Sequence, residues 1–337
     1  MNRIVTSAPG KILLCGEYVV LDGAPALCVA INRRASVSIQ ENGLAQHAVT
    51  SPGFADDRFL FSVDASGGFD WQTSDAERPD FSLLEQVWAA LKPVPPAPVD
   101  MVLDTRAFTD PSSERKFGLG GSAALTVALS AAIASLQHAT VDVDQIIESH
   151  RQFQDGRGSG ADIAASYTGG LIEYQIGNPA MLYPMKWRGD LQMAVLWSGK
   201  SVSTSDKLSQ FASAKLGSNS RRDLAAASAA IVSAWSDSDA GKIMSLFGSY
   251  TEDLVEFSNA QGLGIFEGGH AELFELAQDS GVVYKPCGAG GGDVGMVLAL
   301  SKDALDRFVD IATAGNFCNL DLSIDDDGLT VGDYKHE

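Results

Sequence analysis

The sequence predicts a mixed α+β protein built from two domains. Its 337 residues, 45% of them hydrophobic, can bury one large core or two ordinary ones. Short apolar runs broken by turn residues fill the first forty positions, whereas long amphipathic helices dominate after residue 204. Because the character of the chain changes in this way, we expect a boundary near residues 183–190, giving domains 1–185 and 186–337.

The first domain is expected to contain both strands and helices. Residues 4–39 fit strands and tight turns, because Pro9-Gly10, Gly16 and Asp22-Gly23 interrupt the apolar runs. Residues 53–79 are polar and glycine-rich and carry no predicted element. Further strands are predicted at residues 33–40, 99–103 and 171–175, and helices at 81–91, 122–137, 141–153 and from 163 to 167.

The second domain is expected to be richer in helices, and no internal repeat is visible. Apolar residues at helical spacing alternate there with short β-branched runs. Helices are predicted at residues 204–215, 221–235, 240–261, 266–280 and 302–314, and strands at 191–197, 282–284, 295–299 and 320–324.

Charge and cysteine content exclude several classes of protein. A formal net charge of −19 argues against nucleic acid or an anionic membrane as partner, because both require a basic patch. Four widely spaced cysteines and no histidine cluster indicate neither a zinc site nor a disulfide framework, so a reducing compartment is expected. The first apolar stretch is too short for a signal sequence or a membrane span, and we expect a cytoplasmic protein.

The loop Gly118-Leu119-Gly120-Gly121-Ser122 is a candidate phosphate cradle. It lacks bulky side chains and leads into a predicted helix, whose free N–H groups and dipole favour an anion. No Gly-Lys-Ser/Thr ends it, so it is not a P-loop. Alone, such a loop fits equally well an ordinary helix start capped by Ser122.

Other charged residues fall on glycine-rich turns as well. Lys11 follows Ala8-Pro9-Gly10; it either extends into solvent from a strand end or meets an anion. Asp162 lies at a predicted helix start, where a carboxylate either caps the helix or faces a cleft. Together with the glycine run Gly288-Ala289-Gly290-Gly291-Gly292, these residues suit phosphoryl transfer, which depends on positioning and charge neutralisation. The basic residues in glycine- or serine-rich segments are Lys11, Lys116, Arg157, Lys200 and Lys285.

Three ordered segments resemble the motifs of the GHMP kinases: Ala8-Pro9-Gly10-Lys11, Gly118-Leu119-Gly120-Gly121-Ser122-Ala123-Ala124 and Lys285-Pro286-Cys287-Gly288-Ala289-Gly290-Gly291-Gly292-Asp293. The resemblance extends over nearly the whole chain. It implies an N-terminal domain like ribosomal protein S5 domain 2, a C-terminal ferredoxin-like domain and an active site between them. It also implies ATP and Mg²⁺ as cofactors.

The resemblance assigns roles to particular residues. It implies that Asp162 orients the acceptor or takes its proton, with Lys11 as its charged partner, and that Ser122 contacts phosphate or Mg²⁺. The residues expected to bind ATP are Lys116, Gly118, Leu119, Gly120, Gly121, Ser122 and Ala123. The residues expected to bind the acceptor are Glu17, Tyr18, Ser159, Gly160, Lys200, Ser201, Ser203, Thr204, Gly290, Gly291 and Asp293. Glu17 is also close enough in sequence to pair with Lys11.

Within the superfamily, the chain resembles the branch that phosphorylates 5-phosphomevalonate, because that branch tends to carry a lysine just before the second motif, as Lys116 is here. The implied partner is this small anionic metabolite. Mevalonate or another small alcohol, a non-catalytic nucleotide-binding role and a related decarboxylase remain alternatives, and both a monomer and a homodimer are compatible with the sequence.

Two positions depart from the family pattern. Gly121 stands where a serine is usual, and Arg151 stands where mevalonate kinases carry a metal-binding glutamate. Glu148 is a weak substitute for that glutamate, so we assign no protein carboxylate to the metal.

Overall fold

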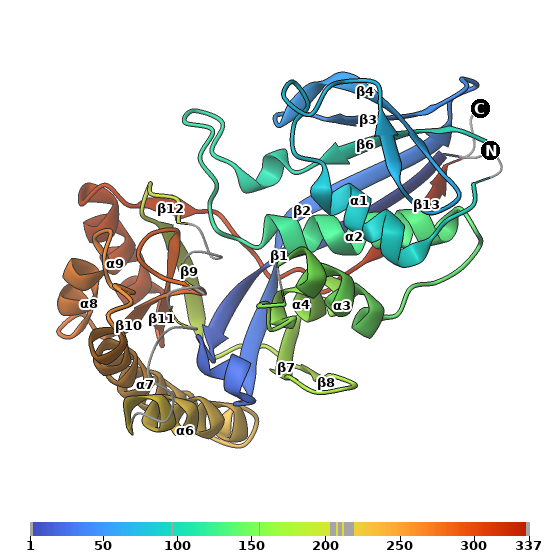
Figure 1. Ribbon diagram of the computed structural model, residues 1–337. Helices are drawn as coiled ribbons and strands as arrows, with labels where there is room; N and C mark the ends of the chain where they lie inside the picture. The colour runs from blue at the N-terminus through green and yellow to red at the C-terminus, as the bar shows by residue number, and fades with distance from the viewer. Residues whose placement is uncertain are drawn as a thin grey trace.

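The computed structural model describes residues 3–95, 97–154, 156–202, 207, 211 and 219–334. Two sheets and the helices packed on them make up this part of the chain (Figure 1). The larger sheet has the order β13-β1-β2-β6-β3-β4-β5, and β7 joins β2 and β8 beside this path. Its strands are β1 (Arg3–Cys15), β2 (Ala26–Glu41), β3 (His47–Ser51), β4 (Ala55–Val63), β5 (Phe69–Trp71), β6 (Val99–Asp104), β7 (Leu171–Gln175), β8 (Met181–Met185) and β13 (Thr330–Tyr334).

The long antiparallel pair β1 and β2 forms the centre of this sheet. Its register runs from Ile4 opposite Ile39 to Cys15 opposite Leu27, with an irregularity between Pro9 and Gly10. Proline lacks an N–H and glycine bends freely, so the strand departs from regular pairing just before Lys11. The first residues of β2, 26–29, pair with β7, and its last residues, 36–41, pair with β6. The sheet therefore continues from β2 in two branches, one through β7 and one through β6.

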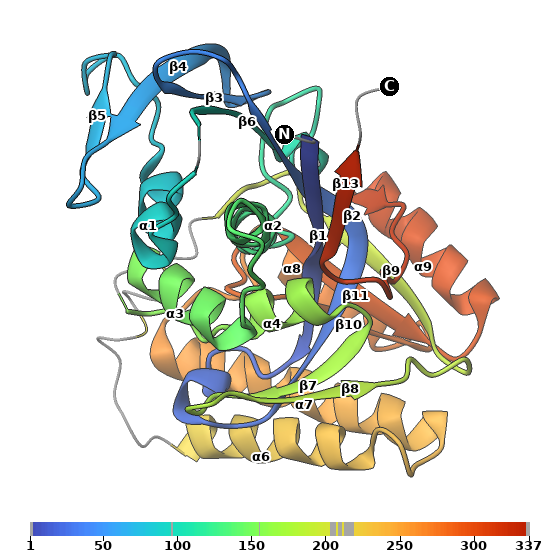
Figure 2. The same ribbon diagram turned by 90° about the vertical axis from the view of Figure 1, so that its right-hand side faces the viewer.

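Helices α1 (Ser82–Leu91), α2 (Gly121–Ser135), α3 (Val143–Phe153) and α4 (Ala161–Thr168) accompany this sheet. Figure 2 shows α2 running between α1 and β1. Nearly every side chain of α2 from Ala123 to Ala134 is buried, and many of them are alanines. A helix that is apolar on all sides must be buried, and small side chains let it approach the sheet closely. The N-terminus of α2 is therefore fixed by the core.

The smaller sheet has the order β10-β11-β9-β12, from β9 (Gln192–Trp197), β10 (Val282–Pro286), β11 (Val294–Ala299) and β12 (Cys318–Leu320). The helices of this part are α6 (Asn219–Ala234), α7 (Ala240–Gln261), α8 (His270–Ala277) and α9 (Lys302–Ala314). Two short 3₁₀ turns, η1 (Val19–Asp22) and η2 (Arg106–Phe108), lie in the first part of the chain. One apolar cluster contains Leu14 of β1, Tyr250 of α7 and Met296 of β11. The two sheets thus share a core. No helix in the described ranges is both long and apolar enough to cross a bilayer.

Most predicted elements are confirmed, and α7, α9 and β7 have the predicted bounds. The predicted strand at residues 320–324 is wrong, because β12 ends at Leu320 and only Ile324 makes a bridge, to Ile31. Strands β3, β4, β5, β8 and β13 were not predicted. The predicted helix at residues 204–215 falls almost wholly outside the described residues.

The end of the chain returns to the first sheet. Strand β13 pairs with β1, with Arg3 opposite Tyr334 and Ser7 opposite Thr330. The last strand therefore lies beside the first, as Figure 2 shows. The division into domains 1–185 and 186–337 stays a prediction, and the C-terminal strand belongs by its pairing to the sheet of the first.

Candidate active site

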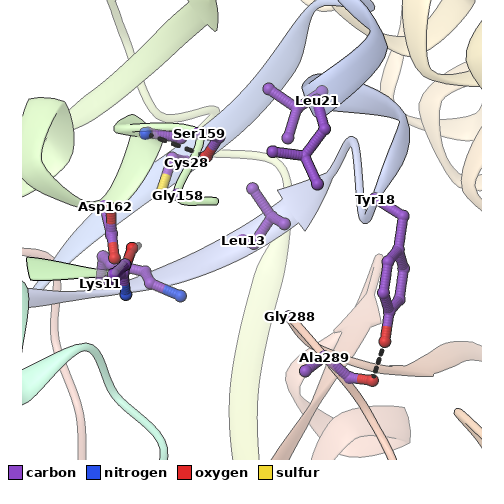
Figure 3. A pocket seen from close by; sticks show the side chains of 13 residues that line it. Lys11, Leu13, Tyr18, Leu21, Cys28, Gly158, Ser159, Asp162, Gly288 and Ala289 are labelled. Atoms are coloured by element: carbon purple, nitrogen blue, oxygen red, sulfur yellow. Dashed lines mark hydrogen bonds between the residues drawn. The ribbon is translucent and has the colours of Figure 1, made fainter. Parts of the chain in front are cut away.

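A cavity of about 110 Å³ lies where the first motif, the Gly158–Asp162 turn and the third motif meet (Figure 3). Strand β1, the turn η1, the start of α4 and the third glycine run all contribute to its walls. The lining residues are Lys11, Leu13, Tyr18, Val20, Leu21, Cys28, Gln154, Gly158, Ser159, Ala161, Asp162, Gly288 and Ala289.

Lys11 and Asp162 lie side by side in this cavity (Figure 3). Asp162 is the second residue of α4, whose N-cap is Gly160, and its carboxylate accepts a hydrogen bond from the next amide, Ile163 N, at 3.0 Å. Burial raises the pKa of the Cys28 thiol, which lines the same cavity, to about 12, while Lys11 lowers it and Asp162 raises it. Both charges therefore act on one small volume, which is the arrangement predicted for a charged catalytic pair.

The loop Gly118–Ser122, the candidate phosphate cradle, lies directly beside Lys11. The Lys11 N–H donates to the Leu119 carbonyl at 2.9 Å. A Cβ at Gly120 would lie 3.1 Å from Lys11 Cγ, so the lysine stem packs across this glycine. Gly120 has a φ of +79° and is the N-cap of α2, and no side chain of the described part of the chain caps this helix. The first N–H groups of α2 are consequently available to an anion.

The other predicted residues of the loop contribute mainly backbone. Leu119 and Ala123 are buried, and their side chains do not line the cavity. Ser122 is exposed, and its hydroxyl lies 3.4 Å from His150 Nε2. Lys116 is exposed at the approach to the loop.

Gly121 has no room for the serine that is usual in the family. A Cβ at this position would lie 2.9 Å from Phe108 Cγ. Phe108 is buried and its ring also restricts Gly10 of the first motif, where a Cβ would lie 2.6 Å from Phe108 Cε1. The missing side chain is therefore explained by packing, and the backbone of the loop is unaffected.

The structure places Glu17 outside the lining of this cavity, although the sequence predicts that it binds the acceptor. Its carboxylate is fully buried, pairs with Lys285 and accepts a hydrogen bond from the Tyr250 hydroxyl. Burial works against the charge of Lys285, but Cys287 and Glu17 outweigh it and raise the pKa of the lysine. Lys285 is itself fully buried, so it is no longer a candidate among the basic residues that could bind a phosphate.

Three of the predicted acceptor residues do lie at the cavity or directly beside it. The Tyr18 hydroxyl donates to the Ala289 carbonyl at 2.7 Å and so joins the first motif to the third (Figure 3). Ser159 accepts from Ala161 N at 3.3 Å, and its carbonyl accepts from Tyr174 at 2.6 Å. Gly160 adopts a φ of +89°, which glycine tolerates and which starts α4.

The third glycine run is placed differently from the prediction. Gly288 and Ala289 line the cavity, whereas Gly290 packs on Ile265 and the Gly291 N–H donates to the Ile265 carbonyl at 2.7 Å. Those two glycines are therefore held by the loop before α8 and do not line the cavity.

The remaining predicted residues lie around the segment 198–202. The side chains of Lys200 and Ser201 are exposed. The Asp293 carboxylate is buried and accepts a hydrogen bond from Val202 N at 3.1 Å. Ser203 and Thr204 lie outside the described residues.

The contacts of two residues near the site, His150 and Arg151, were not predicted from the sequence. His150 is buried on α3, close to Ser122, and burial lowers its pKa although Asp162 acts in the opposite direction. Arg151 donates to the carbonyls of Gly158 and Ser159 at 3.2 and 3.5 Å and fixes the turn before α4. Only the helical period of α3, which brings these residues toward the turn, could have indicated them.

A metal would find few protein ligands here. Across the described ranges, no three His, Cys, Asp or Glu side chains gather in a way that could hold an ion. Glu148 pairs with Arg151 at 3.5 Å and accepts from Gln152 at 3.0 Å, so it does not replace the family's glutamate. The donor set suits an ion held largely by the oxygens of a bound phosphate group.

Comparison with known proteins agrees with this geometry. The model of the GHMP kinases N terminal domain matches residues 83–170. A phosphomevalonate kinase of Streptomyces sp. (strain CL190) is 30% identical, over 90% of this chain and 92% of that protein. A mevalonate kinase of Pyrococcus horikoshii is 26% identical over 61% of this chain and 60% of that protein.

Solved structures show the same fold. The Lin0012 protein of Listeria innocua has a TM-score of 0.83 at 21% identity and covers 98% of this chain and 99% of its own. The phosphomevalonate kinase of Streptococcus pneumoniae, in complex with phosphomevalonate and AMPPNP, has a TM-score of 0.76 at 18% identity, with coverages of 95% and 99%. The predicted α+β fold is thereby confirmed, and the chain belongs to the GHMP kinase family.

Proposed function

We propose that the chain transfers the γ-phosphoryl group of ATP to 5-phosphomevalonate, giving ADP and 5-diphosphomevalonate in isoprenoid biosynthesis. The observation that carries this proposal is the position of Lys11, which lines one cavity with Asp162 and packs across Gly120 at the N-terminus of α2. The Streptomyces and Streptococcus relatives are phosphomevalonate kinases, which supports 5-phosphomevalonate as the acceptor.

On the donor side, the loop Gly118–Ser122 would bind the ATP phosphates through backbone N–H groups. Lys11, whose stem crosses Gly120, would place its ammonium against the transferred group and neutralise developing charge. Mg²⁺ would supply further charge neutralisation on the phosphate oxygens. Ser122, whose hydroxyl is exposed beside the loop, is the protein group proposed to contact it.

On the acceptor side, a phosphate oxygen of the acceptor attacks the γ-phosphorus while the bond from that phosphorus to the ADP oxygen breaks. Asp162 orients this oxygen and accepts its proton when the acceptor arrives as a monoanion. Such an acceptor needs cations besides Lys11, and the exposed Lys116 and Lys200 are available for it.

Mevalonate is the competing acceptor, since mevalonate kinases are among the relatives. Arg151 argues against it, because this guanidinium is bound to the carbonyls of Gly158 and Ser159 where mevalonate kinases have a carboxylate. Mevalonate also carries only a carboxylate and no phosphate, so it offers Lys116 and Lys200 less negative charge than 5-phosphomevalonate does.

The test is an ADP-release assay with 5-phosphomevalonate and mevalonate in parallel. We expect turnover with the phosphorylated acceptor and at least a hundredfold lower kcat/KM with mevalonate. Turnover of mevalonate alone would refute the proposed acceptor but keep the kinase. Tight ATP binding with no turnover of either compound would favour the non-catalytic alternative, and CO₂ release from a diphosphorylated acid would favour a decarboxylase.

A further inference from the structure

Asp293, the residue after the third glycine run, lies against the phosphate-binding loop. A Cβ on Gly118 would lie 2.3 Å from Asp293 Cγ and 2.5 Å from its Oδ2. The carboxyl group therefore occupies the space that a side chain at position 118 would need. Asp293 is 8% exposed and has a φ of +53°, a conformation in which aspartate and asparagine are enriched.

The same residue binds the segment 198–202 at three points. Its N–H donates to the Lys200 carbonyl at 2.7 Å, and its carbonyl accepts from Ser198 N at 2.9 Å. Its Oδ1 accepts from Val202 N at 3.1 Å. Gly292 allows this close approach, because a Cβ there would lie 3.0 Å from the Lys200 carbonyl oxygen.

A second contact ties the same segment to the phosphate loop. Arg115, the neighbour of Lys116, donates from Nη1 to the Gly199 carbonyl at 2.9 Å. Both contacts connect segment 198–202 with the chain that enters the loop at Gly118. The backbone that carries Lys200 is thus fixed relative to the site of the ATP phosphates from two sides.

The surroundings of the carboxylate argue against a direct contact with an anionic acceptor. Burial raises the pKa of Asp293 to about 6, while the Val202 amide and Lys11 act in the opposite direction. A buried carboxylate would repel a phosphate, so a direct contact with the acceptor is unfavourable. The Asp293 Oδ1 already accepts a hydrogen bond from Val202 N. Binding Val202 requires a hydrogen-bond acceptor at this position but no negative charge.

We propose that Asp293 is a positioning residue that holds segment 198–202, and with it Lys200, against the phosphate-binding loop at Gly118. It acts through the hydrogen bond from Val202 to Oδ1. The inference rests on the proposed function, in which Lys200 meets the acceptor phosphate.

The test compares Asp293→Asn, Asp293→Gly and Asp293→Ala. Asparagine keeps an acceptor oxygen and tolerates the positive φ, glycine tolerates the φ without the acceptor, and alanine lacks both advantages. We expect Ala and Gly to raise the KM for 5-phosphomevalonate about tenfold, with the KM for ATP changed less than twofold, and Asn to restore most of the loss. Loss in Asn equal to that in Ala would overturn the proposal, because the charge would then be required. Loss in Ala but not in Gly would overturn it too, because backbone strain would be the cause.

A variant at another position tests the same segment independently, in case the Asp293 variants misfold. Arg115→Ala should raise the same KM severalfold, and Arg307→Ala, at an exposed position on α9, serves as its matched control. Equal effects of the two arginine variants would contradict the role of segment 198–202.

Hydrogen exchange separates this inference from the proposed function, since it needs no turnover. Without any acceptor, the Val202 amide should exchange at least tenfold faster in Asp293→Ala than in the wild type and in Asp293→Asn. Unchanged exchange would overturn the inference even if the kinase is active. A wild type that turns over no acceptor would refute the proposed function and leave this readout intact.

Discussion

Glu17 and Lys285 form an ion pair from which solvent is completely excluded. Glu17 follows β1 of the larger sheet, and Lys285 belongs to β10 of the smaller one. Tyr250 of α7 completes the group, because its hydroxyl donates to Glu17 and accepts from Gly16 N at 2.8 Å. Lys285 Nζ also donates to the Pro286 carbonyl at 2.9 Å. These polar contacts connect the end of β1 in the larger sheet with β10 in the smaller one.

Removal of one partner should therefore be costly. We expect Lys285→Met to lower the free energy of unfolding by about 3–5 kcal/mol, since it leaves the Glu17 carboxylate buried and unpaired. Urea unfolding followed by circular dichroism measures this. The double variant Glu17→Gln/Lys285→Met should recover part of the loss. A single-variant loss below about 1 kcal/mol would mean that the pair contributes little to the fold.

His270 gives the stability a dependence on pH. Burial lowers its pKa to about 4, although its hydrogen bond to the Gly292 carbonyl acts in the opposite direction. The unfolded chain binds this proton near pH 6.5, so the stabilising effect is complete above that pH and is lost as the pH falls toward 4. Between pH 7.5 and 5 the wild type should lose about 2 kcal/mol that His270→Gln does not lose. His138→Asn, at an exposed position with a φ of +53°, should behave like the wild type in the same denaturation series.

Gly121 should resist replacement by serine, the residue that the family resemblance leads us to expect there. We expect Gly121→Ser to cost about 1–3 kcal/mol of stability, because the new Cβ would collide with Phe108. Thermal unfolding provides the measurement. The double variant Gly121→Ser/Phe108→Leu, in which a smaller side chain replaces the ring, should lose less stability from the serine than Gly121→Ser loses alone. If Gly121→Ser melts like the wild type, the packing explanation of this departure fails.

Asp162 should matter for turnover far more than for nucleotide binding. Asp162→Asn keeps the size of the side chain and removes its charge, so kcat should fall by about 10²–10⁴-fold. The affinity for an ATP analogue, measured by calorimetry, should change less than threefold. Equal losses in both quantities would indicate a misfolded protein or a different catalytic residue.

The parts of the candidate site that could be singled out from the sequence are those whose signal is local. Lys11, the Gly118–Ser122 loop and Asp162 each carry their signal in a few neighbouring residues, and the fold brings them to one place. Glu17 was assigned to the acceptor because its partner lies 268 residues away in the sequence, where no local pattern reveals it. The same holds for β13, which finds its place only by pairing with β1.

Strands with mixed surroundings were missed for another reason. In β4, exposed charged residues from Asp56 to Arg58 precede the buried Phe59 and Phe61. This segment lacks the regular alternation of a half-buried strand, and its polar start fits a loop equally well. Contacts with β3 and β5, which are non-local, decide its structure.

The central claim is that a phosphate group accepts the phosphoryl group of ATP at the Lys11–Asp162 site. Phosphorus-31 NMR of the purified protein with ATP, Mg²⁺ and 5-phosphomevalonate tests it most directly. We predict that the acceptor's monophosphate resonance disappears while two coupled diphosphate resonances and those of ADP appear, and that Asp162→Asn slows this conversion at least a hundredfold. An unchanged monophosphate resonance while the protein phosphorylates mevalonate under the same conditions would contradict the account.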